Sequence, residues 1–240
     1  MNKRILAAMA ASALIVSSLA GCSENTESTP NQQSSSSSSK PASSGKPADN
    51  SSSSAESKPQ DAARVMIKGK EYDVETTTEL KLPVSGVTDD DVVQIGKLTN
   101  LNKLHLYGNK ISDITPLAKL TGLTELQLYN NDIVDVAPLA ELTNLTQLEL
   151  SGNKISDIKP LEKLTNLTVL HLYDNQIDNI TSLTKLTGLT ELTLGSNKIV
   201  DIKPLAKLTN LTKIWLDNNN IGDADIAWLK EKFPDCDIIV

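Results

Sequence analysis

Hydrophobic and polar positions recur along this chain with a period of 22 residues. Five successive copies fill residues 98–207, and each reads LTxLxxLxLxxNxIxxIxxLxx, with one valine in place of an isoleucine. A sixth copy begins at Leu208 with LTNLTKIWLDNNNI, and an irregular one precedes the series at about residues 80–97. A fixed period of this length is typical of a solenoid, in which stacked repeats bury a continuous core.

The apolar positions of each repeat all serve the core. One repeat buries too little apolar surface to offset the entropy of ordering its backbone, so neighbouring repeats have to stack. The LxL segment predicts a short strand with both leucines inward, and stacked copies predict a parallel sheet. In the first copy the apolar positions are Leu98, Leu101, Leu104, Leu106, Ile111, Ile114 and Leu117.

Two polar columns have structural roles. An asparagine follows each strand, and its amide can pair backbone groups where the chain turns. A proline in four of the five copies forbids a long helix on the opposite side, so we expect short 3₁₀ turns there. The asparagines are Asn109, Asn131, Asn153, Asn175, Asn197 and Asn219; the prolines are Pro116, Pro138, Pro160 and Pro204, with Ser182 in the fourth copy.

The two ends of the array differ from its centre, and we expect an N-terminal hairpin cap and a C-terminal helix-strand cap to cover the ends of the core. In residues 64–97, VMIKGKEYDV predicts a hairpin that turns at Lys68 and Gly69, and Thr88 with Asp91 predicts a capped helix start. A calcium site at Asp89 to Asp91 is the weaker interpretation, because no EF-hand spacing follows. Residues 98–219 form the repeats. In residues 220–240, Asp223 predicts a helix over 224–232, and CDIIV predicts a last strand.

The N-terminus has the features of an export signal. Residues 1–21 contain a short basic region and then an apolar run too short to span a bilayer. Leu19, Ala20, Gly21 and Cys22 resemble the lipobox of bacterial lipoproteins, which implies lipid on Cys22 and an extracytoplasmic membrane anchor. An ordinary secretory signal with an incidental cysteine is the alternative. The Ser-rich residues 22–63 predict a disordered tether.

Net charge narrows the range of partners. The chain carries −7, and removal of Lys3 and Arg4 with the signal leaves −9. That balance argues against nucleic acid, which requires a basic stripe. It also argues against attraction of the side chains to anionic lipid. Cys236 has no partner once Cys22 is acylated, so we expect it to be a small buried hydrophobe.

The strand residues beside the inward leucines point to the opposite, concave face of the sheet. Every aromatic or histidine side chain within the repeats lies there, and exposed aromatics on a rigid sheet are typical of protein-binding surfaces. A cross-strand ladder without a ligand is the simpler interpretation, with Lys103–Glu125, Glu149–His171 and Glu191–Lys213 as its pairs. A glycan ligand stays open. The candidate binding residues are Lys103, His105, Tyr107, Glu125, Gln127, Tyr129, Gln147, Glu149, Val169, His171, Tyr173, Glu191, Thr193, Lys213, Trp215 and Asp217.

Catalytic chemistry is not indicated. His105 and His171 lie three repeats apart, about 14 Å, which is too far for one metal or one proton relay. The chain lacks HExxH, GxSxG, a Gly-rich phosphate loop and a paired cysteine motif. We therefore expect no enzyme, no cofactor and no metal, and a monomer that binds another protein.

The repeat, with its NxIxDIxPLxxLTNL phrase, closely resembles the 22-residue leucine-rich repeats of bacterial internalins from Leu98 to about Ile221. The resemblance implies a leucine-rich-repeat horseshoe of the α/β solenoid class. Its concave parallel sheet would bind another protein, in some members a host receptor. The chain differs from the invasive members in its front hairpin and in its lipobox. We expect a lipid-anchored binding protein at the bacterial cell surface, with a carbohydrate- or cell-wall-binding lipoprotein as the alternative.

Overall fold

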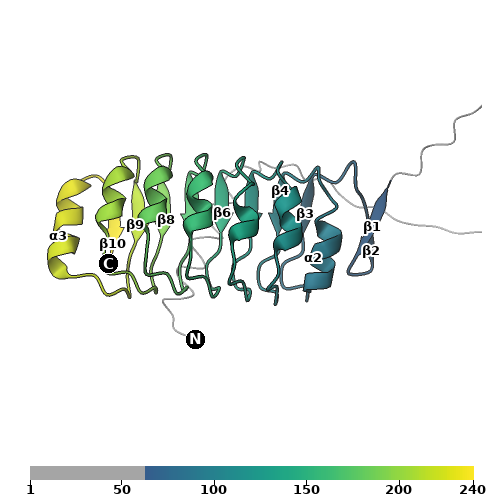
Figure 1. Cartoon of the computed structure of the whole chain (residues 1–240), viewed down its shortest axis with the longest axis horizontal. Coiled ribbons are helices and arrows are strands. Elements are labelled where there is room, and N and C mark those ends of the chain that lie inside the picture. The colour runs from purple at the N-terminus through teal and green to yellow at the C-terminus, as the bar shows by residue number, and fades with distance from the viewer. Residues whose placement is uncertain (1–62) are drawn as a thin grey trace, which may run out of the picture. The chain divides into compact units, whose positions relative to one another are not determined.

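The structure, a computed structural model, describes residues 63–240. Residues 1–62 lie outside the described residues, so the predicted signal peptide, the lipid attachment at Cys22 and nearly all of the predicted tether are not examined by it. The described part of the chain is a stack of coils, each with a strand on one side and a short helix on the other (Figure 1).

One parallel sheet of eight strands runs through the stack, and its strand order follows the chain from β3 to β10. Equivalent residues of successive repeats pair directly, as in Leu104 with Leu126 and Leu126 with Leu148. This register keeps every repeat in step with its neighbours. The strands are β3 Glu79–Lys81, β4 Lys103–His105, β5 Glu125–Gln127, β6 Gln147–Glu149, β7 Val169–His171, β8 Glu191–Thr193, β9 Lys213–Trp215 and β10 Asp237–Ile239.

The predicted apolar positions form one continuous core. All seven positions of the first repeat are at most 1% exposed, and their equivalents along the array are buried in the same way. Each coil therefore contributes leucines and isoleucines that the coils on either side cover. The solenoid prediction is confirmed.

The asparagine column joins each repeat to the one before it. The side chain of Asn153 accepts a hydrogen bond from the backbone N–H of Ile133 at 3.1 Å. It donates to the carbonyls of Leu128 at 3.1 Å and Leu150 at 2.9 Å. Asn131, Asn175 and Asn197 make equivalent bonds. One amide thus pairs three backbone groups where the chain leaves the strand.

Short 3₁₀ helices form the side opposite the sheet, as predicted. They are η1 Thr115–Lys119, η2 Ala137–Leu139, η3 Lys159–Lys163, η4 Thr181–Lys185 and η5 Lys203–Lys207. The turn persists in η4 without its proline because Asn179 accepts a bond from the N–H of Thr181 at 2.9 Å. Asp113 makes the same contact with Thr115 at 2.8 Å. An Asx turn therefore starts each 3₁₀ helix, with proline as reinforcement.

The predicted hairpin is present at the first end of the stack. Strands β1 Arg64–Ile67 and β2 Lys70–Asp73 pair antiparallel around Lys68 and Gly69, whose φ angles are 51° and 77°. Positive φ at both turn residues is the type I′ geometry that suits a two-residue hairpin. Val65 and Ile67 are buried in the common core.

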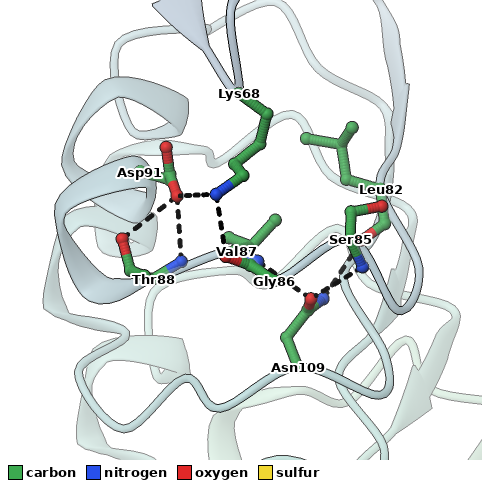
Figure 2. Close-up of polar contacts among 8 residues, drawn as sticks. All are labelled: Lys68, Leu82, Ser85, Gly86, Val87, Thr88, Asp91 and Asn109. Atoms are coloured by element: carbon green, nitrogen blue, oxygen red, sulfur yellow. Dashed lines mark hydrogen bonds and ion pairs between the residues drawn. The ribbon is translucent and has the colours of Figure 1, made fainter.

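Polar contacts connect the hairpin to the irregular first repeat (Figure 2). Lys68 Nζ donates to the Gly86 carbonyl at 3.0 Å and lies 3.7 Å from the Asp91 carboxylate. Asp91 also accepts bonds from the backbone and hydroxyl of Thr88, both at 3.0 Å. Thr88 is therefore the N-cap of helix α2 Asp89–Ile95, as predicted. Asp91 serves the helix cap and the hairpin together.

The last coil ends in helix α3 Asp223–Lys232 and strand β10. The helix begins one residue earlier than predicted, because Gly222 rather than Asp223 has the extended N-cap conformation, with φ −73° and ψ 148°. Leu229 and Phe233 are buried, whereas Cys236 is only half-buried rather than fully enclosed as expected. Neither α-helix of residues 63–240 has the length and apolar content needed to cross a bilayer.

Candidate functional site

The candidate site is the concave face, defined as the side chains of β3 to β10 that point away from the core together with the residue that follows each inward leucine pair. Three rows run across the strands. Backbone pairing continues past the strands, since the N–H of Gly108 donates to the carbonyl of Tyr129 at 2.9 Å. The row of Tyr107, Tyr129, Ser151 and Tyr173 is therefore held as firmly as the strands themselves.

One charged network lies at the β4 and β5 strands. Glu125 accepts contacts from Lys103 Nζ at 3.1 Å and from His105 Nε2 at 2.8 Å. The amide of Gln127 donates to the same carboxylate at 3.0 Å. His105 is 7% exposed and Glu125 is 8% exposed. The predicted Lys103–Glu125 pair thus exists within a larger polar cluster, in which His105 and Glu125 are buried and Lys103 is exposed.

A second network is centred on His171, in the middle of the sheet. Its Nδ1 contacts the Glu149 carboxylate in β6, and its Nε2 lies 3.4 Å from the Glu191 carboxylate in β8. His171 is 3% exposed. An imidazole between two carboxylates is favoured as the charged imidazolium.

The pKa values of the two histidines are shifted in opposite directions. Burial disfavours the charged form of His171, but its contacts with the Glu149 and Glu191 carboxylates outweigh burial and raise the pKa of His171 to about 9. Burial lowers the pKa of His105, and Glu125 is too weak a partner to reverse it. At neutral pH the concave face therefore has one positive and one neutral histidine.

Aromatic side chains lie beside these networks. Tyr107 and Tyr129 stack with ring centroids 4.3 Å apart and an interplanar angle of 8°. Burial, and next Tyr107, raise the pKa of Tyr129 far above its ordinary value, so its hydroxyl stays protonated. Lys213 Nζ lies 5.1 Å from the centroid of the Trp215 ring. A Cβ at position 195 would come within 2.8 Å of Tyr173, so only glycine lets Tyr173 settle there.

The structure corrects one expectation about this face and refines another. His105 and His171 are buried rather than exposed, because side chains of one row sit on strands about 4.8 Å apart and close over one another. Glu191 and Lys213 do lie opposite each other in β8 and β9, as predicted, but the closer contact of Glu191 is with His171, and Lys213 lies over Trp215. Tyr107, Tyr129, Tyr173 and Trp215 are half-buried and still offer ring surface.

The remaining candidates lie in the same rows. Val169, Thr193 and Asp217 are half-buried, and Gln147 is exposed. Glu149 is 8% exposed and belongs to the His171 network. All the candidate positions thus share one face, but their side chains differ widely in accessibility.

Two features of this face were missed in the sequence. Glu79 and Lys81 of β3 extend it by one strand and pair with each other at 2.7 Å. Val84, next to the tyrosine row, is 75% exposed and has φ 49°. The equivalent positions of later repeats hold Gly, Asn, Asp or Ser, all with positive φ. Aligning Val84 with Gly108 reveals this left-handed column.

Comparison with known families decides the assignment. The profile of the family described as leucine-rich repeats (two copies) matches residues 99–141, 143–185 and 187–230, which together exceed half of the chain. The chain belongs to the leucine-rich-repeat family. Within the leucine-rich-repeat proteins it is of the internalin type, as the solved structures that resemble it indicate. A comparison with curated protein sequences found no match.

The internalin C2 structure from Listeria monocytogenes is 37% identical, with a TM-score of 0.63, and the alignment covers 69% of this chain and 71% of that one. An internalin (inlF) of the same organism is 39% identical with a TM-score of 0.61, over 64% of this chain and 44% of that one. A leucine-rich-repeat protein of Leptospira interrogans is 32% identical with a TM-score of 0.59, over 62% of this chain and 39% of that one. This chain thus spans less than half of the inlF internalin.

Proposed function

We propose that this leucine-rich-repeat protein is a noncatalytic binding module that holds a protein partner on its concave face. The observation that carries the proposal is the arrangement of that face. Half-buried aromatic rings, with Tyr107 and Tyr129 stacked at 4.3 Å, lie beside charges already fixed by partners. Aromatic and charged side chains that are already held in place lose little conformational entropy when a partner binds.

A protein fits this face better than a glycan does. Tyr107 and Tyr129 stack on each other, so each ring has one flat face already covered. Lys213 lies over Trp215 and covers part of that ring as well. A sugar that needs a free ring face finds little here, whereas a protein surface can use ring edges, hydroxyls and the charges of Lys103 and Asp217.

Site-specific cross-linking tests the location and the class of the partner together. A photoreactive amino acid at Ser151 lies in the tyrosine row, and the same group at Ser156 is the control, because Ser156 is exposed on the turn that follows Asn153. We expect a protease-sensitive adduct from position 151 in intact cells and none from position 156. A protease-resistant, glycosidase-sensitive adduct would support the carbohydrate-binding alternative. Equal adducts from both positions would contradict the proposal.

We propose further that lipid on Cys22 anchors the protein to the outer face of a bacterial membrane. The support is the LAGC sequence after a short apolar run. Cys22→Ala is expected to leave the precursor unprocessed or to release the protein from membranes. Ser23→Ala is the control and should be processed normally. Unchanged incorporation of labelled fatty acid into Cys22→Ala would rule out this anchor.

A further inference from the structure

A column of lysines runs along one edge of the solenoid, outside the concave face. Lys119, Lys163, Lys185 and Lys207 are the last residues of η1, η3, η4 and η5, and Lys97 holds the equivalent place after α2. All five are exposed. The sixth position of this lysine column is Glu141, which follows η2.

On the side toward the strand, the neighbours of the lysine column are uncharged; on the other side, Glu162 directly precedes Lys163. In every repeat from 97 to 210, a buried leucine follows the column position. The next residue toward the strand is a threonine, and the one after it is an asparagine or a glycine. Further on, Thr124 and its equivalents donate their hydroxyls to the backbone of the preceding repeat, at 3.0 to 3.1 Å. Glu141 is therefore the sole carboxylate among these columns, on an edge of a chain with net charge −7.

Most of the lysines also have no carboxylate partner. Glu141 pairs with Lys163 at 2.6 Å. Over residues 63–240 the other ion pairs involve none of Lys97, Lys119, Lys185 and Lys207. A lysine at the end of a helical turn gains a little from the helix dipole. That gain explains each lysine alone, but it does not explain why acids are missing from the columns on the strand side.

We propose that the lysine column binds a flexible linear polymer of phosphate groups. Successive repeats lie about 5 Å apart, so the ammonium groups form a single file that a chain of phosphates can follow. Lysine is a common phosphate ligand, acting as a compact point charge. The exposed threonines beside the column, such as Thr121 and Thr187, add hydroxyl donors.

The shape of the column favours a linear chain over a membrane surface. Peripheral membrane binding combines a basic surface with apolar side chains that enter the bilayer. Here the residues on the strand side of the lysines that are not buried are threonine, asparagine and glycine, and the residues directly before them are Gly96, Ala118, Glu162, Thr184 and Ala206. A single row of positive charges without large exposed apolar neighbours suits a linear polymer of phosphate groups better than a membrane surface.

The test is a titration of the full chain with long-chain inorganic polyphosphate, followed by calorimetry at several salt concentrations. Lys185→Gln with Lys207→Gln should weaken binding about tenfold and reduce the slope of log K against log salt by about 1.4. Lys110→Gln with Lys198→Gln removes the same charge from exposed positions outside the column and should change neither quantity.

A variant that should bind polyphosphate more tightly gives a sharper test. Glu141→Lys fills the gap in the lysine column and frees Lys163, so affinity should rise several-fold. Glu231→Lys makes the same change of charge on α3 and should have no such effect. Equal responses to the variants inside and outside the column would overturn the proposal. The proposal would also be overturned if anionic phospholipid vesicles bound through the same lysines with an affinity per phosphate group equal to that of polyphosphate.

Discussion

His171 and His105 show how position on one sheet sets the charge of a residue. Both are buried in the middle row of the concave face, yet His171 touches two carboxylates and His105 touches one. The attraction of two carboxylates outweighs the free-energy cost of burying a charged imidazole at His171, and the attraction of one carboxylate does not outweigh it at His105. The pattern of strand residues alone did not predict this difference, because it depends on how side chains of adjacent rows close over each other.

This difference predicts opposite effects of pH on stability. The folded pKa of His171, about 9, exceeds its unfolded value, so its contribution is complete below pH 6.5 and is lost as pH rises through 9. His171→Gln should remove that fall, which is on the order of 3 kcal/mol. The lowered pKa of His105 makes wild type less stable as pH falls below 6.5, and His105→Gln should remove that loss instead.

Urea unfolding at a series of pH values measures both slopes. The wild-type free energy of unfolding should fall on both sides of neutral pH. His105→Gln should remove the part of the acid fall that begins just below pH 6.5, and His171→Gln the part of the alkaline fall between pH 6.5 and about 9, while falls at more extreme pH, which come from other groups, should persist. Retention of the fall between pH 6.5 and about 9 in His171→Gln would show that His171 is not held as an imidazolium.

Val84 is a strained residue at the edge of the same face. A β-branched side chain with φ 49° costs about 1–2 kcal/mol, and Val84 is 75% exposed. Val84→Asn places the residue found at equivalent positions 130 and 218 and should raise the free energy of unfolding by about 1 kcal/mol. Thermal unfolding should show a rise of about 2–4 °C. Val134→Asn, at an exposed valine without positive φ, should give no rise.

At the level of elements, the sequence predicted most of the fold because one phrase specifies one coil. The leucines, the asparagine column and the Asp-led 3₁₀ turns recur, so an inference made for one repeat applies to the next. The hairpin turn at Lys68 and Gly69 and the helix start at Thr88 depend on local chemistry that sequence shows directly. Side-chain pairing across repeats was less predictable, since Lys213 had both Glu191 and Trp215 within reach.

The hairpin offers a direct test of its capping role. Ile67 is 0% exposed, and its neighbour Met66 is 56% exposed on the other side of the same strand. Ile67→Ala should lower the free energy of unfolding by about 2–4 kcal/mol and raise amide exchange in α2 first, because it opens the first end of the core. Met66→Ala should leave both unchanged. Equal stability of the two variants would mean that the hairpin does not protect the stack.

At the scale of the whole molecule, different residues support the fold and carry the proposed recognition. The asparagine column and core hold the coils in register, and the concave face presents aromatic rings among paired charges. The lysine column lies on a different edge, so binding of a protein and binding of a polyanion need not compete. Lipid on Cys22 is a prediction from residues outside the described part of the chain.

The central claim is that the tyrosine row of the concave face binds the protein partner. The decisive measurement is the dissociation constant of the cross-linked partner for wild type and for the triple variant Tyr107→Ala, Tyr129→Ala and Tyr173→Ala. We expect the constant to rise by at least about a hundredfold, since buried aromatic anchors dominate such interfaces. The melting temperature should fall by only a few degrees, because the ring stack contributes about 1 kcal/mol.

The matched control replaces exposed Val93, Val134 and Val200 with alanine, which removes apolar surface elsewhere on the solenoid. This variant should bind as wild type does. Undiminished binding by the tyrosine variant, or an equal loss in the valine variant, would contradict recognition through the concave face.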